Sequence, residues 1–564
     1  MNYKKSILYA ALSLGLSITV TAQSPKFSLN GLGRSIIAKN NLGGNFTKEN
    51  EGIQTRDVSG YNLFDLQSNL DLDSTFYAKA VFRTRSPFGT SFGSQTTFEF
   101  RQFKMGGKVG GLKYEFGDIR LELTPFTLFN SDVASTGYES EIFKGRRDIV
   151  EYENFNFGNT WLLQGASSQY SWNIGKASEL GIYAFTTRTV STNSLQTVPD
   201  RLLSGGRVQY AFNSNVKLGV NSVSLYDAVT NSSEFDYNNN VVTGDLKYKR
   251  ALGSGEFSMN IEAGGSFYFY EYNDNVNDVD TSYKDLTMAL ELAYKLKSGL
   301  KFGIDAKRVG AVFASPTAQT RRFNPLMAPS LFGKDRTSQV YYDQFINEDI
   351  YNSGIDINLM TYANIFNNIN PYGAATPNRF VVGATFATDT SVSNYGANVR
   401  FDYGSEIIGE GGDPKRTFIV VTAGGVLHLN NLLNVDRLID LNAGVRYENT
   451  SRSEGAIVDL TSMLVDFGAS VEVAKKLDLQ VGLKYFSAKG NEFITQRDGF
   501  NLVSGFQELD VDVNEVVFSG GIRIRFSKKQ SFSLNYNNMQ FSDNITSTES
   551  LNLGQLFFGY VGKF

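Results

Sequence analysis

The sequence predicts an all-β protein, namely an antiparallel outer-membrane β-barrel of ~14–20 strands with long loops and one structured insertion. Features at both ends of the chain support this fold. Residues 1–22 have the basic start and the apolar run of an export signal. The last strand-like segment places Leu556, Phe558, Tyr560 and Phe564 two or four residues apart, an alternation typical of strands in bacterial outer-membrane barrels.

Alternation of apolar and polar residues also recurs inside the chain. The runs 256–269 and 284–296 place apolar or small residues at every second position, whereas a helix would space them three and four apart. Both runs are longer than the ~5–6 residues of ordinary strands and reach the ~9–11 that a bilayer requires. A soluble β-sandwich would show the same alternation, but strand length and the end signals favour the barrel. In a barrel, the charged residues of the opposite faces point into the lumen: Glu262, Glu291, Lys301, Asp305, Lys484, Arg523 and Arg525.

The chain divides into three parts. Residues 1–22 form the signal peptide, and residues 23–60, rich in Gly and Asn without clean alternation, are predicted to be an N-terminal extension or plug segment. Residues 61–564 form the barrel domain, in which 315–379 contains half of the 10 prolines and is predicted to be the structured insertion. Helix-like spacing of apolar residues predicts a short amphipathic helix over 340–351.

The composition excludes several classes of function. The chain has no cysteine, which removes disulfides, thiolate metal sites, cysteine nucleophiles and a lipid anchor on cysteine. The single histidine, His428, lies in a strand-like stretch without a nucleophile-elbow pattern, so a structural role is expected. A net charge of −4 gives no basic footprint for nucleic acid. We therefore predict no enzyme, no cofactor and no metal centre.

Two polar features leave alternatives open. The loop 271–285 carries Asp274, Asp278, Asp280 and Asp285, whose oxygens suit Ca²⁺. It lacks the spacing of an EF-hand, so a solvated turn is the simpler interpretation. The basic pairs Arg146-Arg147, Arg321-Arg322 and Lys415-Arg416 suit either lipopolysaccharide phosphates or plain surface solvation. The predicted partners are outer-membrane lipid and lipopolysaccharide.

Three further stretches carry a family resemblance: residues 83–89 (RTRSPFG), 117–128 (GDIRLELTPFTL) and 370–379 (NPYGAATPNR). Together with the export signal that ends at Ala22, they resemble exported β-rich proteins of Bacteroidota. More specifically, the chain is similar to the Plug subunit family of the type IX secretion translocon.

This resemblance implies a non-catalytic protein that closes the periplasmic opening of a large translocon barrel. It implies either a location in the cell outer membrane or a periplasmic body docked on an outer-membrane complex. The candidate partner contacts are Arg83, Arg85, Phe88, Arg321, Arg322, Tyr372 and Arg379. Two alternatives remain open from the residues, which are a stand-alone porin for small solutes and a surface adhesin or receptor barrel.

Overall fold

The computed structural model describes residues 25–44, 58–72, 75–88, 96–131, 135–154, 161–192, 198–229, 233–273, 278–319, 367–388, 394–410, 413–497, 503–545 and 549–564. The predicted signal peptide 1–22 and the predicted helix over 340–351 lie outside these ranges.

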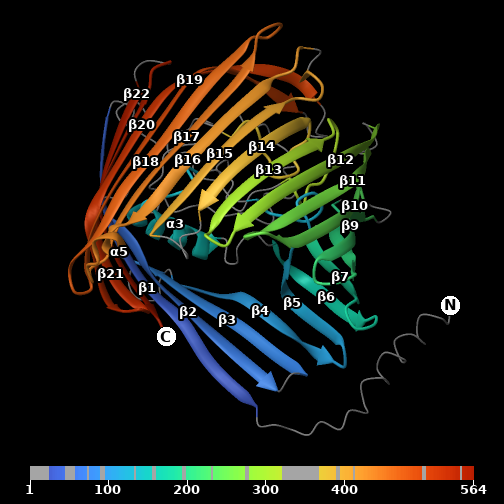
Figure 1. Cartoon of the computed structure of the whole chain (residues 1–564), viewed down its shortest axis with the longest axis horizontal. Helices are drawn as coiled ribbons and strands as arrows, with labels where there is room; N and C mark the ends of the chain where they lie inside the picture. The colour runs from blue at the N-terminus through green and yellow to red at the C-terminus, as the bar shows by residue number, and fades with distance from the viewer. Residues whose placement is uncertain are drawn as a thin grey trace, which may run out of the picture.

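The described residues form one sheet of 22 strands in which consecutive strands pair antiparallel (Figure 1). The first half of the wall contains β1 (Lys26–Gly43), β2 (Val58–Leu72), β3 (Phe76–Pro87), β4 (Thr97–Val109), β5 (Leu112–Leu121), β6 (Trp161–Asn173), β7 (Glu179–Val190), β8 (Asp200–Ala211), β9 (Val216–Ala228), β10 (Phe235–Leu252) and β11 (Gly255–Asn273). The second half contains β12 (Asp278–Leu296), β13 (Leu300–Val309), β14 (Arg379–Thr388), β15 (Tyr395–Ser405), β16 (Thr417–His428), β17 (Ile439–Arg452), β18 (Val458–Ala474), β19 (Leu477–Arg497), β20 (Val503–Ser527), β21 (Gln530–Asp543) and β22 (Glu549–Lys563).

The sheet closes because β1 pairs with β22 in register from Leu32↔Lys563 to Gly43↔Asn552. The pairing continues to the last residue, where the backbone of Phe564 exchanges hydrogen bonds of 3.1 and 3.2 Å with Gly31. The Phe564 ring stacks on Phe64, with 5.6 Å between the ring centroids. A Cβ at Gly31 would lie 2.2 Å from that ring, so only glycine permits this approach. Closure leaves the sheet of described strands without a free edge.

The two faces of the wall have opposite chemistry, as β18 and β19 show. Phe467 and Leu483 point outward and are 49% and 40% exposed, whereas their neighbours Asp466 and Lys484 are each 2% exposed on the inner face. The predicted alternation is therefore confirmed, with apolar side chains outside and charged side chains inside. The apolar residues of the last strand also follow it, because Leu556, Tyr560 and Phe564 are exposed on the outer face.

Connections differ sharply between the two ends of the barrel. Most even-numbered strands lead into the next strand through short turns, such as those after β10, β12, β18 and β20, while most odd-numbered strands lead into longer connections. The turns at 297–299 and 528–529 are among the short ones. Short periplasmic turns and longer extracellular loops are usual in such barrels, so both inward-folded segments described below belong to the predicted extracellular end.

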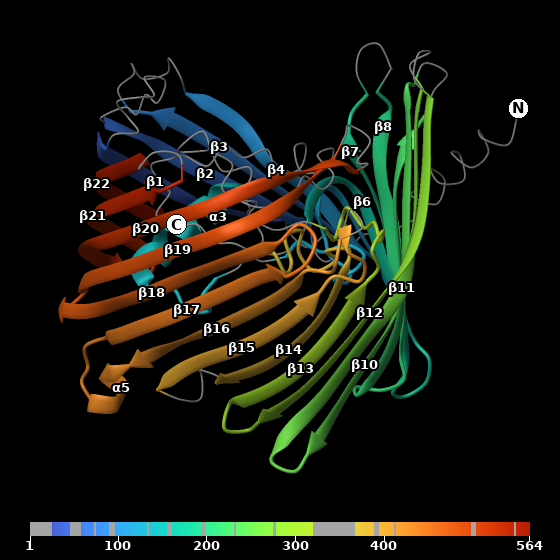
Figure 2. The same ribbon diagram turned by 90° about the horizontal axis from the view of Figure 1, so that it is seen from above.

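Two helices accompany the strands. The helix α3 (Glu141–Asn154) lies inside the ring of strands in both views (Figures 1 and 2). The short α5 (Leu429–Leu433) forms part of the turn between β16 and β17. The sequence did not predict α3, because its apolar residues are few and its basic pair suggested a loop.

Two predictions about the wall need correction. The described strands number 22 rather than ~14–20, and β1 lies within residues 23–60, which were predicted to be an extension or plug segment. The alternation in β1 is obscured because its inner face is largely apolar. Leu32, Ile36 and Ala38 pack there against material in the lumen, while the outer face contains Gly33 and Ser35.

The closed wall, its apolar exterior and its charged interior define a transmembrane β-barrel of the bacterial outer membrane. None of the helices within the described ranges has the length and apolar character needed to cross a membrane.

Candidate functional site

Two segments fold inward and fill part of the lumen. The first, 122–154, connects β5 to β6 and includes α3, and the second, 310–378, connects β13 to β14 and is described at 310–319 and 367–378. They contact each other directly. Thr317 Oγ1 donates to the carbonyl of Thr127 at 2.5 Å, and the amide of Ala374 donates to Ser131 Oγ at 2.9 Å. Two of the stretches that carry the family resemblance, 117–128 and 370–379, therefore participate in this internal contact.

An apolar cluster joins the first segment to the wall. Leu121 and Leu128 are fully buried, and Ile149 and Tyr152 of α3 pack against the same group. The wall residues of this apolar cluster are Leu32, Ile36, Ala38, Tyr61, Leu63, Ile119, Leu163, Phe185, Leu203, Val223, Leu225, Tyr237, Tyr270 and Phe557. Their burial in the lumen stabilises the folded segment by removing apolar surface from water.

The N-terminal end of α3 is held by charged groups of β18 and β19. Glu139 accepts hydrogen bonds from Lys484 Nζ and Arg147, with Arg147 Nε 2.8 Å from Glu139 Oε2. The amide of Ser140 donates to Asp466 Oδ1 at 3.3 Å. Burial tends to raise the pKa of Glu139, but the ammonium of Lys484 and the guanidinium of Arg147 outweigh it and hold that pKa below its ordinary value. Glu139 is therefore an ionised link between the helix and the wall.

The C-terminal end of α3 is held by β2, β3 and β4. Tyr152 donates its hydroxyl to Asp65 Oδ2 at 2.6 Å, and Asp65 also accepts both forks of Arg83 at 2.7 and 2.8 Å. Arg101 Nη1 lies 2.6 Å from the same carboxylate, and its guanidinium also lies 4.3 Å from the centroid of the Tyr152 ring. Cations near the C-terminus of a helix complement its dipole. The helix is thus attached to the wall at both ends.

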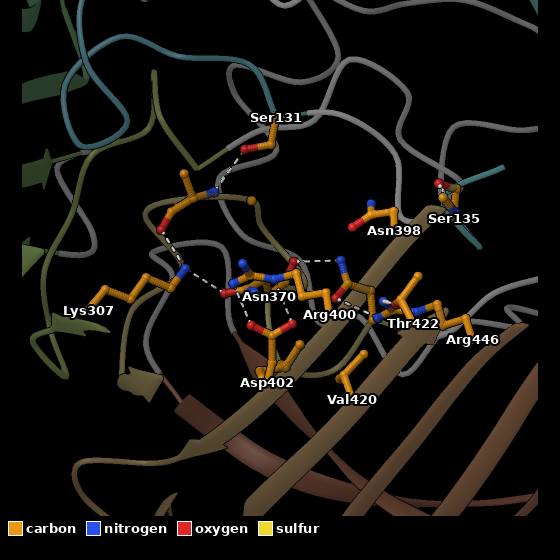
Figure 3. Close-up of a pocket in the computed structure, with 15 residues that line it drawn as sticks. Ser131, Ser135, Lys307, Asn370, Asn398, Arg400, Asp402, Val420, Thr422 and Arg446 are labelled. Carbon is orange, nitrogen blue, oxygen red and sulfur yellow. Dashed lines mark hydrogen bonds and ion pairs between the residues drawn. The ribbon is translucent and has the colours of Figure 1, made fainter. Parts of the chain in front are cut away.

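A polar cavity of about 340 Å³ remains between the inward segments and the wall (Figure 3). It is lined by Ser131, Ser135, Gly137, Lys307, Asn367, Ile369, Asn370, Gly373, Ala374, Asn398, Arg400, Asp402, Val420, Thr422 and Arg446. Both inward segments and the strands β13, β15, β16 and β17 contribute to this lining. This polar cavity is our candidate functional site.

The strands of the polar cavity carry acids and bases in pairs. Arg400 of β15 bridges Asp402 on its own strand at 2.5 Å and Asp305 of β13 at 2.8 Å. On β17, Arg446 Nη2 lies 2.7 Å from Glu448 Oε2. Such pairing is expected, because a buried charge is tolerated only with a partner.

Lys307 differs from these arginines in its partners. Its ammonium donates to Asn370 Oδ1 at 2.7 Å and to the carbonyl of Ala374 at 2.9 Å. Both acceptors belong to the second inward segment. Lys307 therefore fixes this segment against β13 and also presents a positive charge to the polar cavity.

Two buried polar atoms of the lining have no hydrogen-bond partner among the described residues. They are the side-chain oxygen of Asn398 and Nε of Arg446. Arg446 is 8% exposed, and its other nitrogens bond to Glu448, Thr422 and Asn367. Both atoms are closed to solvent, so neither is open to a molecule in the polar cavity.

The structure also places the acidic residues that could bind Ca²⁺ and the single histidine. Within the described ranges, no group of three or more His, Asp and Glu side chains gathers as a metal site would require. Asp274 lies outside those ranges, and Asp278, Asp280 and Asp285 lie on β12. His428 ends β16, and its Nδ1 lies 2.6 Å from Asp440 Oδ1.

The basic pairs also lie elsewhere than expected. Arg146 and Arg147 belong to α3 inside the barrel, and Arg146 is 2% exposed against the ring of Phe557. Arg416 joins Glu406, Glu410 and Glu492 in a buried network. For these three arginines, surface solvation was wrong, because Arg146 and Arg147 lie on α3 inside the barrel and Arg416 is enclosed by three carboxylates.

The predicted partner contacts near residue 85 lie at the end of β3. Arg83 is buried in the ion pair with Asp65, and the guanidinium of Arg85 lies 3.9 Å from the centroid of the Tyr61 ring. The amide of Phe88 donates to the carbonyl of Gly60 at 2.9 Å. The structure gives Arg83 and Arg85 internal partners, and a contact with another protein remains a prediction.

The remaining predicted contacts belong to the second inward segment. Arg379 is buried and donates to the carbonyls of Asn368 and Ile369 at 3.0 and 3.2 Å, which turns the segment back into β14. The amide of Tyr372 donates to Thr376 Oγ1 at 3.1 Å. Arg321 and Arg322 lie outside the described residues.

Sequence reasoning identified Asp305, the partner of Arg400, as lumen-facing but missed the residues that line the polar cavity. A usable signal was present, since Asp305 and Lys307, Arg400 and Asp402, and Arg446 and Glu448 are acid–base pairs two residues apart. Two residues apart on a strand means the same face. The pairs come together only because β13, β15 and β17 lie close in the wall.

Comparisons with known proteins place the chain beside porins at low similarity. No family model matches the chain, and no curated protein matches it. Pseudomonas aeruginosa OccK5 (OpdH) matches with 11% identity and a TM-score of 0.35, covering 96% of this chain and 98% of its own. A BenF-like porin from Pseudomonas fluorescens Pf-5 matches with 9% identity and a TM-score of 0.34, covering 96% and 99%. OccK2 (OpdF) of P. aeruginosa in complex with glucuronate matches with 8% identity and a TM-score of 0.36, covering 96% and 98%. Similarity at this level does not place the chain in their family.

Proposed function

We propose that this chain is a stand-alone outer-membrane channel for small polar solutes, that is, a porin whose lumen is narrowed by the two inward segments. The observation that carries the proposal is the polar cavity, which is bounded by both segments and by charged residues of the wall. A barrel that served only as a membrane anchor would have no need of buried charges inside, because each costs desolvation free energy.

The arrangement of the inward segments supports a selective rather than a wide channel. Glu139 and Tyr152 bond the two ends of α3, and with them the first segment, to the wall. Lys307 and Arg379 hold the second segment through hydrogen bonds to its residues. These bonds hold both segments in the lumen. Solutes therefore pass beside fixed polar groups, and the polar cavity is the place where they are recognised.

Conductance in planar lipid bilayers tests the proposal. The refolded full-length protein is expected to give discrete current steps, and heat-modifiable migration on a gel checks that the inserted protein is folded. Folded protein that inserts repeatedly without any current would overturn the channel function.

The type IX plugging role depends only on the three short stretches that carry the family resemblance. Co-purification with the translocon from membranes, combined with the absence of current, would favour that role over the porin. Protease treatment of intact cells tests the adhesin or receptor alternative, which requires loops accessible from outside. Binding of lipopolysaccharide likewise remains a prediction.

A further inference from the structure

We propose that the predicted periplasmic rim of the barrel, from α5 to the end of β22, binds the headgroups of anionic phospholipids in the inner leaflet of the outer membrane. This inference goes beyond the proposed channel function, because it depends on the barrel spanning the membrane and not on whether it conducts. It is argued from a cluster of basic side chains, from their distance to the lipid-exposed wall and from the apolar surface of α5.

Basic side chains gather on consecutive connections at this end of the wall. The amide of Arg525 donates to the carbonyl of Lys476, and the amide of Lys563 donates to the carbonyl of Lys529, both at 2.8 Å. Arg437 Nη1 donates to the carbonyl of Val473 at 2.9 Å, so these connections are neighbours in space. Together they present six exposed basic residues, which we call the basic rim: Arg437, Lys475, Lys476, Lys528, Lys529 and Lys563.

The basic rim has a surplus of positive charge. Within the connections 429–438, 475–476 and 528–529, Asp436 is the only exposed acidic side chain. The nearby Glu472 is already paired with Arg525 at 3.0 Å. Exposed charges act over about 8–10 Å at physiological salt, so a surplus of ammonium groups attracts an anionic surface. Four members of the basic rim form no ion pair with another described residue, namely Lys475, Lys528, Lys529 and Lys563.

The basic rim lies at the depth of phospholipid headgroups. Leu479 and Phe564, on the outer face of the wall, are 45% and 48% exposed. Leu479 follows Lys476 by three residues, and Phe564 follows Lys563 directly. One to three residues of a strand span about 3–10 Å, and the headgroup layer extends about 5–8 Å beyond the hydrocarbon on each side. The ammonium groups therefore lie at the level of the lipid phosphates.

The apolar surface of α5 favours a lipid over an acidic protein as the occupant. Leu432 and Leu433 are 60% and 61% exposed, and Val435 in the same connection is 44% exposed. No residue of α5 is buried, and the helix lies beyond the ends of β16 and β17 (Figure 2). Exposed leucines beside basic residues are typical of helices that lie in a membrane interface. The same surface thus offers charges to phosphates and leucines to acyl chains.

The inference is tested by quenching of a fluorescent probe beside the basic rim. The chain has no cysteine, so Ala474→Cys provides a single attachment point at the end of β18. The labelled full-length barrel is folded into phosphatidylcholine vesicles that contain either spin-labelled phosphatidylglycerol or spin-labelled phosphatidylcholine. The anionic lipid is expected to quench more strongly at the same concentration. High salt should remove this preference, because it screens exposed charges.

Removal of three lysines from the basic rim should abolish the preference. The variant combines Lys475→Gln, Lys528→Gln and Lys529→Gln. A lysine near an anionic surface strengthens binding about fivefold, so the preference for the anionic lipid should fall about fivefold or more.

The matched control removes three exposed lysines from the opposite end of the barrel and therefore has the same net charge. It combines Lys39→Gln, Lys415→Gln and Lys489→Gln, and it should leave the preference unchanged. A probe on Leu433→Cys tests α5 separately. Quenching by lipids brominated in their acyl chains supports insertion of α5, whereas quenching by aqueous iodide alone overturns it.

The outcomes separate this inference from the proposed function. Equal quenching by the two lipids in the otherwise unchanged barrel overturns the headgroup site and leaves an acidic protein as the remaining partner. An equal loss of preference in the matched control overturns its location at the basic rim. Heat-modifiable migration checks that each variant is folded. Conductance is measured independently, because a barrel without current can still prefer anionic lipid and a conducting barrel can lack this preference.

Discussion

The apolar cluster and the polar cavity lie in the same lumen and share one inward segment, yet they are built differently. Leu128 of the first segment is fully buried in the apolar cluster together with Leu121, the last residue of β5. Only a few residues later, Ser131, Ser135 and Gly137 line a cavity whose wall is charged. The lumen is therefore divided into an apolar region that holds the first segment and a polar region that retains a cavity.

The largest expected effect comes from placing the same charge in each region. Leu121→Asp puts a carboxylate without a partner among apolar residues. This should lower the free energy of unfolding by several kcal/mol and prevent folding. Thr422→Asp places it in the polar cavity, where Arg446 Nη1 lies 3.5 Å from the Thr422 hydroxyl, so folding should persist. Heat-modifiable migration on a gel shows whether each of the two variants is folded. Equal behaviour of the two variants would contradict the division of the lumen.

Truncating an aromatic side chain sharpens the comparison. Phe557 is 1% exposed in the apolar cluster, and the guanidinium of Arg146 lies 4.0 Å from its ring centroid. Phe557→Ala should lower the free energy of unfolding by about 3–5 kcal/mol. Urea unfolding in detergent micelles measures the change, with Asn535→Ala as the control. A loss below about 1 kcal/mol would show that this cluster is loosely packed.

The outer face provides a third environment for comparison with both lumen regions. Leu483 points outward from β19, beside the inward-facing Lys484. Leu483→Lys should lower the free energy of unfolding by about 2–4 kcal/mol, because it places an ammonium group in lipid. Unfolding in lipid vesicles provides the measurement. One residue away, the ammonium group of Lys484 is tolerated on the inner face, because it forms an ion pair with Glu139.

Acid should weaken the ionic attachment of α3 but not the apolar cluster. The pKa of Glu139 is held below its ordinary value of 4.5, so its stabilisation is complete above that value and is lost as the pH falls through the folded pKa. Each unit of pKa shift corresponds to about 1.4 kcal/mol. Glu139→Gln should therefore reduce the loss of stability in urea between pH 6 and pH 3. An unchanged pH profile would mean that the link contributes nothing.

The smallest effect is expected at His428, outside both regions. Its ion pair with Asp440 is partly exposed, and exposed pairs contribute about 0–1 kcal/mol. His428→Ala should keep both stability and bilayer conductance close to those of the wild type. A folded variant without conductance would assign this histidine a function after all.

Sequence reasoning succeeded where one face of a strand meets lipid and the other meets water. The runs in β11 and β12, and the final residues of β22, alternate because their outer side chains are apolar and exposed to the bilayer. It failed for β1 and α3, since both pack against apolar material inside the lumen. Their hydrophobic residues therefore do not follow the pattern expected of a wall around water.

The sequence alone favoured a β-barrel in the outer membrane, because strand length and alternation of period two are local properties of each strand and the export signal lies in residues 1–22. It also determined which charged residues face inward on several strands. Only the tertiary structure decided how many strands close the ring and that two connections fold into it. It also decided that acid–base pairs from β13, β15 and β17 surround one cavity, because pairing of distant segments depends on wall closure and not on local sequence.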